Sequence, residues 1–141
     1  MVSIKPYLSV KSALDAINLY KKVFNAELIE RVPVEQEQAK GFGVPDDLDL
    51  SKTTMHASIK IGDHVIYLAD NFSGGVLEHT NVALLIEVDS VEQAEKYFKK
   101  AEKNKCNIYA KFEKQFWGDY FGGFKDPFGV NWQVNCTPPK E

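Results

Sequence analysis

The sequence predicts an α+β fold of two βαβββ modules related by pseudo-twofold symmetry, because one strand-then-helix pattern occurs twice in it. Ser12 and Ala16 recur as Ser90 and Ala94 at the same offset along the chain. A duplication with so few copies and so long a period is not a solenoid, which needs about three or more stacked repeats. Further matches at this offset are Val10 with Val88, Tyr20 with Phe98, and Lys21-Lys22 with Lys99-Lys100.

Module one is predicted to span residues 1–70 and to begin with a strand and a helix. Apolar and polar side chains alternate over Lys5–Val10, which predicts a half-buried strand. Ser12 is typical of a helix N-cap, and Asn25 ends the helix. A second strand is predicted over Glu27–Glu35. The buried stripe of the helix is Leu14, Ile17, Tyr20, Val23 and Phe24.

The rest of module one holds the least regular stretch of the chain, followed by a hairpin. Residues 36–52 contain glycines, a proline and several aspartates, which predicts a long loop. Loops of this length are typical of functional lids or of partly disordered segments. Strands are predicted over Thr54–Ile61 and His64–Asp70, joined by a turn at Gly62-Asp63. Residues 71–80 follow as a linker.

Module two, residues 81–136, is predicted to repeat this plan. Its last turn is Asp126-Pro127-Phe128-Gly129, in which proline fixes one φ angle and glycine supplies permissive geometry. Residues 137–141 form a tail, and residues 1–141 together make a single domain. The predicted elements are strands over Asn81–Val88 and Asn107–Glu113, a helix capped by Ser90 with the stripe Val91, Ala94, Tyr97, Phe98 and Ala101, and a hairpin over Phe121–Asn135.

Composition and charge exclude several classes of protein. The chain has 141 residues, of which 44% are hydrophobic and 26% charged, as is typical of one globular domain. Its net charge of −3 offers no basic surface for nucleic acid. The longest apolar run, Val82–Ile86, is far below the ~20 residues of a membrane span, and Met1–Val10 shows no secretory signal. Cys106 and Cys136 are two distant cysteines, which favours reduced thiols in a cytoplasmic protein.

Several short motifs carry a resemblance to a known family. They are Pro6–Val10, Tyr20–Ala26, Met55–Ala57, and Gln115–Asp119 running into Asp126–Gly129. With them the chain resembles the vicinal oxygen chelate superfamily, also called the glyoxalase/bleomycin-resistance/dioxygenase fold, and within it the PhnB-like branch. The resemblance implies mixed sheets that curl around a cleft, and a homodimer. It implies no single activity, because members range from metal-dependent isomerases, dioxygenases and thiol transferases to metal-free proteins that sequester antibiotics.

The resemblance also implies metal-ligand positions on matching strands of the two modules. In this sequence they fall on Lys5, Ala83 and Gln133, and on either Ile66 or Tyr67 according to the register of the hairpin. Lysine and alanine are not metal ligands at neutral pH, and one glutamine is a weak anchor for a divalent ion. We therefore expect no cofactor and no stoichiometric metal at these positions.

Strand alternation independently indicates one polar row of side chains in each module. The last strand carries three amides on one face, and the polar row of the first strand takes the equivalent place by symmetry. Such a row is either a solvated face or the wall of a polar pocket, and the symmetry favours the pocket wall. The two rows are Asn131, Gln133 and Asn135, and Lys5, Tyr7 and Ser9. The ligand-binding candidates among these strands are Tyr7, Tyr67, Asn131 and Gln133.

Three further candidates come from histidine and from an aromatic cluster. His56, on the polar side of its strand, is either a structural histidine or a proton donor and acceptor that contacts a ligand. It is the candidate catalytic residue. Gln115 and Trp117 belong to a cluster that either closes the core under a loop or offers a flat surface to a ligand. His64 and His79 are expected at the surface.

Three functions fit these features. The first is a PhnB-like protein that binds a small organic molecule in the cleft between the modules, without the usual metal. The second is a metal-dependent lyase or dioxygenase with non-standard ligands, such as His56 with Asp46 or Asp49. The third is a resistance protein that sequesters a drug between aromatic side chains. The carried-over ligand positions favour the first function over the second, and the sequence names neither a ligand nor a reaction.

Overall fold

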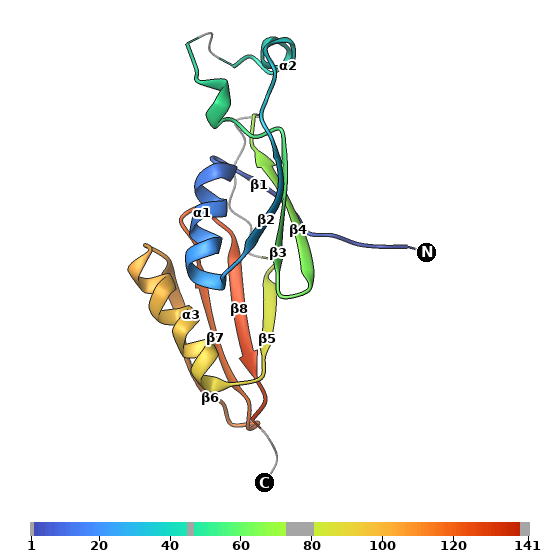
Figure 1. The fold of residues 1–141 in the computed structure, drawn as a ribbon. Helices are drawn as coiled ribbons and strands as arrows, with labels where there is room; N and C mark the ends of the chain where they lie inside the picture. The colour runs from blue at the N-terminus through green and yellow to red at the C-terminus, as the bar shows by residue number, and fades with distance from the viewer. Residues whose placement is uncertain (1, 45–46, 73–80, 139–141) are drawn as a thin grey trace. The chain divides into compact units, whose positions relative to one another are not determined.

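The computed structural model describes residues 2–44, 47–72 and 81–138. The chain divides into two compact units, Met1–Leu77 and Glu78–Glu141, and each is described by itself (Figure 1). The boundary between them falls inside the predicted linker, residues 71–80. Most of that linker and the last three residues of the predicted tail lie outside the described residues.

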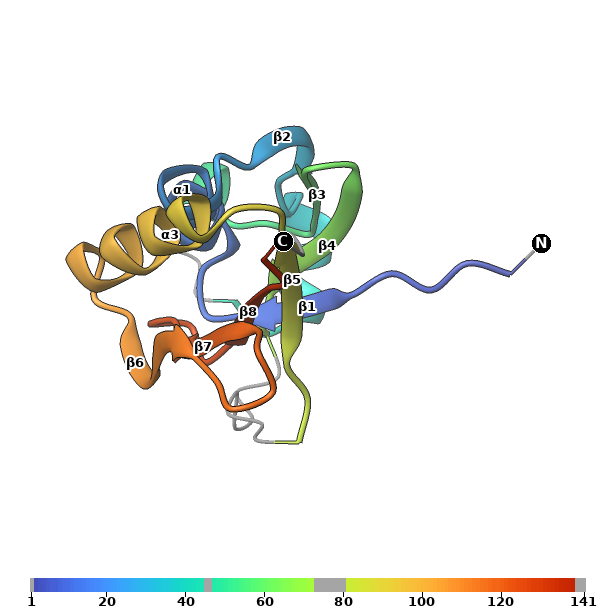
Figure 2. The ribbon, with the colours of Figure 1, turned by 90° about the horizontal axis from the view of Figure 1, so that it is seen from below.

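Unit 1 is a four-stranded mixed sheet with helix α1 against one face (Figures 1 and 2). The strand order is β1-β4-β3-β2, in which β1 is parallel to β4 and the other neighbours are antiparallel. The elements are β1 (Tyr7–Val10), α1 (Ala13–Phe24), β2 (Glu27–Val32), α2 (Gln36–Gly41), the 3₁₀ helix η1 (Leu50–Lys52), β3 (His56–Ile61) and β4 (His64–Asp70).

Helix α1 begins and ends at the residues that the sequence indicates. The amide of Asp15 donates to Oγ of Ser12 at 3.2 Å, which satisfies one of the amides that a helix N-terminus leaves without an intrahelical acceptor. Asn25 ends the helix with a φ of 60°, a left-handed conformation that asparagine tolerates. The predicted apolar stripe is buried against the sheet except for Leu14, which is only half-buried.

The segment that the sequence predicts to be a loop, residues 36–52, contains two short helices instead. The amide of Glu35 donates to the side-chain carbonyl of Gln38 at 3.1 Å and so starts α2. The carboxylate of Asp49 accepts from the amide of Ser51 at 3.0 Å and starts η1. Both helices are too short and too polar to show an apolar period in the sequence, which is why the prediction missed them.

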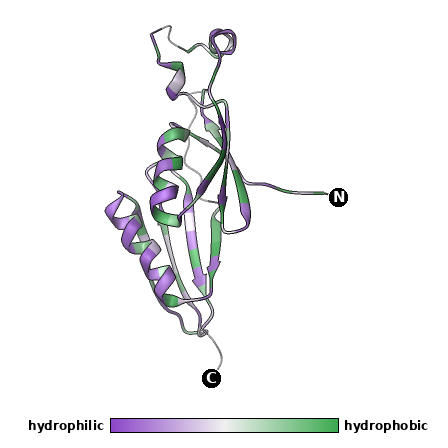
Figure 3. Ribbon diagram, in the orientation of Figure 1, coloured by the Kyte–Doolittle hydropathy of each residue, from purple (hydrophilic) through white to green (hydrophobic). Residues whose placement is uncertain are grey.

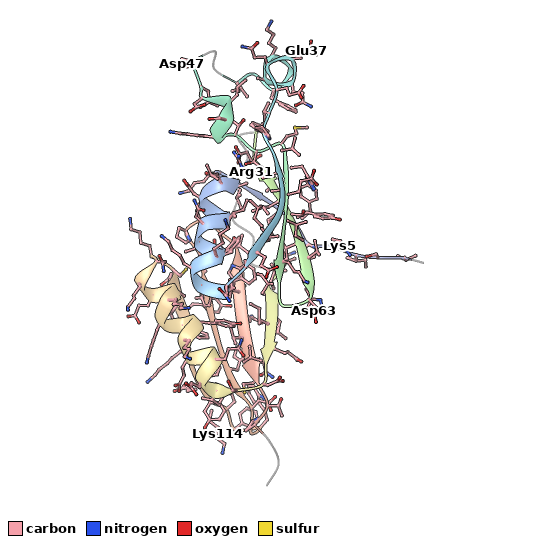
Figure 4. The ribbon with its side chains drawn as sticks, in the orientation of Figure 1. Lys5, Arg31, Glu37, Asp47, Asp63 and Lys114 are labelled. Carbon is pink, nitrogen blue, oxygen red and sulfur yellow. The ribbon has the colours of Figure 1, made fainter. Side chains whose placement is uncertain are left out.

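The preceding strand prediction, Glu27–Glu35, is also too long, and the residues around its end explain why. β2 ends at Val32 because Pro33 has no N–H for the ladder. Arg31 then fixes the returning chain to β2 (Figure 4). Its Nη2 donates to the carbonyl oxygens of Ser51 and Thr53 at 2.9 and 2.8 Å, and its Nε donates to Oγ1 of Thr54 at 2.9 Å.

Unit 2 repeats the arrangement of unit 1. The strand order is β5-β8-β7-β6, with β5 parallel to β8 and the other neighbours antiparallel. This confirms the predicted α+β fold of two repeated modules, although the first strand begins at Leu84 rather than Asn81. The elements are β5 (Leu84–Val88), α3 (Val91–Lys103), β6 (Asn107–Lys114), β7 (Tyr120–Lys125) and β8 (Asn131–Cys136).

Helix α3 is more polar than α1, with hydrophobic residues only along the side that meets the sheet (Figure 3). The amide of Gln93 donates to Oγ of the predicted cap, Ser90, at 3.1 Å. The Gln93 side chain donates to the Tyr97 hydroxyl at 2.9 Å instead of returning to the cap. In the described part of the chain, neither this helix nor any other is long and apolar enough to cross a membrane. The buried residues of α3 are Ala94, Phe98 and Ala101.

The turn between β7 and β8 is organised by a buried carboxylate. Asp126 is only 4% exposed, and its Oδ1 accepts from the amides of Phe128 and Val130 at 2.9 and 3.0 Å. Its Oδ2 accepts from Nε1 of Trp132 at 2.9 Å, so one side chain ties the turn to the largest buried residue of β8. Hydrogen bonds to a charged acceptor are stronger than bonds between neutral groups.

The two cysteines, predicted to be reduced, are not joined to each other. Both are free; Cys136 is buried and Cys106 is partly buried. Desolvation, with a smaller contribution from Asp126, raises the pKa of the Cys106 thiol to about 12. Desolvation also raises the pKa of Cys136, so both thiols stay protonated near neutral pH.

We expect Asp126→Asn to lower the free energy of unfolding by about 2–3 kcal/mol. The substitution removes the negative charge of the acceptor and replaces one carboxylate oxygen with an NH₂ group, which cannot accept the N–H bond that the oxygen accepted. Urea unfolding followed by far-UV circular dichroism measures the loss. Asp63→Asn is the matched control, since Asp63 lies exposed in the turn of the equivalent hairpin of unit 1. An equal loss in the two variants would contradict the role given to Asp126.

Candidate functional site

Three of the predicted site residues come together on unit 1, on the face of its sheet opposite α1, here called the open face of unit 1. The Tyr7 hydroxyl and Nδ1 of His56 are hydrogen-bonded at 3.1 Å. The ring of Tyr67 lies against both, with centroids 5.9 Å from Tyr7 and 5.1 Å from His56. We call these three residues the aromatic triad. The register explains the cluster. Tyr7 and Ser58 are both direct neighbours of Tyr67 across the sheet, and His56 lies two residues before Ser58 on the same face of β3.

The triad presents polar atoms beside the faces of its aromatic rings. The Tyr7 side chain is 55% exposed, and those of His56 and Tyr67 are partly exposed. The hydrogen bond between Tyr7 and His56 can run in either direction, because the tautomer of the imidazole decides which atom donates. A phenol paired with an imidazole can hydrogen-bond a ligand and can also exchange a proton with it.

Lys5 does not belong to this face, although the sequence predicts it in one row with Tyr7 and Ser9. β1 begins at Tyr7 because Pro6 has no N–H; the carbonyl of Pro6 accepts the first ladder bond from the Tyr67 amide at 2.9 Å. Lys5 lies on the chain that precedes the sheet, where its Nζ donates to Oγ of Ser3 at 2.9 Å (Figure 4).

On unit 2, the predicted amide row lies on the sheet face opposite α3, the open face of unit 2. The row alternates along β8 with buried side chains, as the pattern indicated. The Tyr109 hydroxyl donates to Oδ1 of Asn131 at 2.5 Å and accepts from Nε2 of Gln133 at 3.3 Å. Nδ2 of Asn135 donates to Oδ2 of Asp119 at 3.3 Å. Tyr109 therefore links Asn131 and Gln133 in one polar network, here called the amide network, while Asn135 is held separately by Asp119. The buried residues of the strand are Trp132, Val134 and Cys136.

Sequence reasoning missed Tyr109, although a signal for it is present. Tyr109 lies on β6, and its ring passes over the intervening strand β7 at Gly123 to reach β8. A Cβ atom on Gly123 would lie 2.5 Å from the Tyr109 hydroxyl oxygen, so only glycine leaves room for the ring. A glycine inside a strand often marks a close approach of another group to the backbone. Gly123 in the predicted hairpin is therefore the sequence signal for the Tyr109 contact.

Gln115 and Trp117 lie in the turn between β6 and β7, not in a core. Phe116 is 97% exposed and Trp117 is 54% exposed, and their rings form an edge-to-face pair with centroids 4.9 Å apart. The Gln115 side chain donates to the carbonyl oxygen of Glu113 at 3.0 Å, so it braces the turn. Phe116 and Trp117 therefore do not close the core under a loop, whereas Tyr120 of the same cluster packs on Phe112.

The remaining metal-ligand candidates are spread over the fold. Of the two alternatives on β4, Ile66 is buried toward α1. Tyr67 is paired with Tyr7 of β1, and Gln133 is paired with Leu85 of β5, so Tyr67 and Gln133 take equivalent places in the two units. Ala83 precedes β5. Asp49, the other loop candidate, accepts a hydrogen bond from the side chain of Ser51. This hydrogen bond is the main cause of the lowered pKa of the Asp49 carboxyl group.

Other acidic and histidine candidates add no metal cluster. Asp46 and His79 lie outside the described residues, and His64 is exposed as expected. Among residues 2–44, 47–72 and 81–138, no three His, Cys, Asp or Glu side chains lie close enough together to hold a metal ion.

The fold and the sequence are both similar to those of known proteins. The model of the Glyoxalase/Bleomycin resistance protein/Dioxygenase superfamily matches residues 4–134. The chain belongs to this superfamily. Protein YjdN of Escherichia coli is 26% identical over 140 residues, which cover 95% of each chain. The crystal structure of PA1353 from Pseudomonas aeruginosa is similar with a TM-score of 0.77 and 26% identity, covering 99% of this chain and 100% of that one.

Two further solved structures share the fold at lower identity. The PhnB protein of Bacillus cereus has a TM-score of 0.77 at 18% identity, over 96% of this chain and 99% of that chain. FosX, a fosfomycin resistance protein of Listeria monocytogenes, has a TM-score of 0.68 at 15% identity, over 96% and 94%. The superfamily and the PhnB-like neighbours agree with the resemblance seen in the sequence.

We expect Gly123→Ala to displace the Tyr109 ring and to break its bonds to Asn131 and Gln133, because the new methyl group occupies the space of the hydroxyl. The side-chain amide signals of Asn131 and Gln133 in an NMR spectrum should shift as they do in Tyr109→Phe. Gly41→Ala is the matched control, since a Cβ there meets nothing within 4 Å. Unchanged amide signals in Gly123→Ala would contradict the packing described.

Proposed function

We propose that this protein binds a small organic molecule through the aromatic triad of unit 1, without the divalent metal of its metal-dependent relatives. The observation that carries the proposal is the hydrogen bond of 3.1 Å between Tyr7 and His56, with Tyr67 packed against both rings. A few convergent polar groups set in an apolar surface are typical of a small-molecule site.

The donor chemistry at the superfamily ligand positions does not fit a metal. The positions that the resemblance implies hold Lys5, Ala83, Ile66 or Tyr67, and Gln133. The strand register sets Tyr7 beside Tyr67 and Leu85 beside Gln133. A lysine, aliphatic side chains, a phenol and one amide are poor ligands for Mn²⁺, Zn²⁺ or Fe²⁺, which prefer imidazole and carboxylate groups. The crystal structure of a FosX variant is a complex with Mn(II) and 1S,2S-dihydroxypropylphosphonic acid. We propose that the present chain shares the fold of that protein and not its metal.

The triad supports two roles for His56, and the first is part of the proposal. As a binding group, the imidazole holds the Tyr7 hydroxyl in one orientation through their hydrogen bond. The hydroxyl is then positioned to hydrogen-bond a polar atom of the ligand. As a general acid or base, the same imidazole would exchange a proton with the bound molecule. The amide network needs no proton transfer, because Asn131 and Gln133 offer both donors and acceptors in fixed directions.

A resistance protein that sequesters a drug is the second candidate, and the exposed pair Phe116 and Trp117 favours it. Two rigid rings at a turn present flat apolar area to a planar molecule at low cost in side-chain entropy. We also propose that the protein acts in the cytoplasm, since its thiols stay protonated and unpaired.

Protein purified without chelators should contain far less than one equivalent of any divalent metal per chain, because the superfamily ligand positions lack imidazole and carboxylate groups. Elemental analysis by mass spectrometry, before and after incubation with zinc, nickel, manganese and iron salts followed by desalting, makes the measurement. One tightly held metal per chain would refute the metal-free proposal and bring forward the lyase or dioxygenase alternative.

A thermal-shift screen of small phenols, organic acids and antibiotics should find compounds whose binding depends on the triad. For such a compound, His56→Gln and Tyr7→Phe should each raise the dissociation constant about tenfold, because each removes one polar contact worth about 1.4 kcal/mol. His64→Gln is the matched control on the neighbouring strand and should bind normally. Binding that survives the triad substitutions but is lost in Trp117→Ala would move the site to the β6–β7 turn and favour the sequestering function.

A further inference from the structure

The Tyr109 hydroxyl fixes the orientation of two side-chain amides on the open face of unit 2. It donates to Oδ1 of Asn131 at 2.5 Å and accepts from Nε2 of Gln133 at 3.3 Å. A hydroxyl has a single hydrogen, so the bond to Asn131 decides that Tyr109 acts as the acceptor toward Gln133. Each amide thus commits one of its two polar groups to Tyr109, the carbonyl of Asn131 and the NH₂ group of Gln133.

The other polar group of each amide is left for a ligand. Among the residues that the structure describes, neither Nδ2 of Asn131 nor Oε1 of Gln133 has a hydrogen-bond partner. Both side chains are partly exposed and lie two residues apart on one face of β8. Because both amides contact the same hydroxyl oxygen, the unused donor and the unused acceptor are within reach of one small molecule.

Apolar surface lies on both sides of Gln133. The Tyr109 ring rests on the backbone of Gly123, the direct neighbour of Gln133 on β7, and the residue is still 48% exposed. Leu85, the direct neighbour of Gln133 on β5, is 51% exposed. A ring packed on backbone is rigid, and its exposed part offers flat area to another ring at little cost in side-chain entropy.

The charges near this surface lie at the two ends of the amide row and have opposite signs. Lys125 is the direct neighbour of Asn131, and Glu87 is the direct neighbour of Asn135. The middle of the row therefore offers uncharged donors and acceptors. A charged ligand would exchange its hydration for these neutral amides, whereas a neutral amide would find a matching donor and acceptor. Asparagine and glutamine read the edges of heterocyclic bases in the same way.

We propose that the amide network, with Leu85 beside it, is a binding site for a neutral planar ring that contains an amide or imide group. The ring carbonyl accepts from Nδ2 of Asn131, the ring N–H donates to Oε1 of Gln133, and the flat face of the ligand covers Tyr109 and Leu85. All of these residues belong to unit 2, so the site goes beyond the function proposed for the triad and holds whether or not the triad binds a ligand.

The first test titrates the protein with three neutral ring amides, uracil, hydantoin and succinimide, while NMR follows the side-chain amide signals of Asn131 and Gln133. At least one compound should shift both sets of signals in a saturable way. Its fully N-methylated analogue lacks the N–H and should bind about tenfold more weakly, and so should benzoate, which is planar but anionic. Saturation by none of the three up to their solubility overturns the proposal, as does equal or tighter binding of the methylated analogue or of benzoate.

The second test locates the binding with substitutions, using the compound that saturates. Tyr109→Phe keeps the ring but releases both amides, and Gln133→Met keeps the size of the side chain but removes its polar atoms. Each should raise the dissociation constant about tenfold in a variant whose circular dichroism is unchanged. Asn135→Ala is the matched control in the same row, because Asn135 is bonded to Asp119 and not to Tyr109, and it should bind within about twofold of the wild type.

The same titration with His56→Gln separates this site from the triad. That substitution removes a polar contact of unit 1 and should leave the binding of the ring amide unchanged. Binding that is insensitive to both Tyr109→Phe and Gln133→Met, or that falls equally in Asn135→Ala, overturns the proposal. Binding that is lost in His56→Gln but kept in Gln133→Met also overturns it and assigns the ring amide to the triad.

Discussion

The parallel pairing of the first and last strand in each unit is the constraint on which the candidate site depends. It sets Tyr7 beside Tyr67 in unit 1 and Leu85 beside Gln133 in unit 2. Because side chains alternate along a strand, a shift of β1 by one residue would turn Tyr7 away from His56 and Tyr67 toward the core and would turn Val10 toward water. The burial of Val10 and Trp132 therefore holds the polar faces in place, although neither side chain belongs to them.

The two open faces use the same frame for different chemistry. In unit 1 the polar atoms belong to aromatic rings that touch one another, and hydrogen bonding is confined to the Tyr7–His56 pair among the triad. In unit 2 the polar atoms belong to amides that Tyr109 and Asp119 hold in fixed orientations. The two sheets have equivalent strand orders, and the side chains on their open faces differ.

The sequence was sufficient where structure follows from local periodicity. Alternation placed Tyr7, His56 and Gln133 on polar faces, and the capping residues fixed both long helices. It was insufficient where a contact crosses several strands or where a segment has no period. Tyr109 reaches the amides only across β7, and the short helices of residues 36–52 follow from caps and from the Arg31 bonds.

The consecutive glycines of β7, Gly122 and Gly123, leave the sheet of unit 2 without a side chain on either face at this point. On the helix side, a Cβ at Gly122 would collide with Phe98 of α3, and on the open side a Cβ at Gly123 would collide with Tyr109. Two aromatic rings thus press on opposite sides of the same pair of peptide groups, with no side chain to absorb a displacement. A displacement of α3 toward the sheet would therefore press on the backbone of β7, against whose other side lies the ring that holds Asn131 and Gln133.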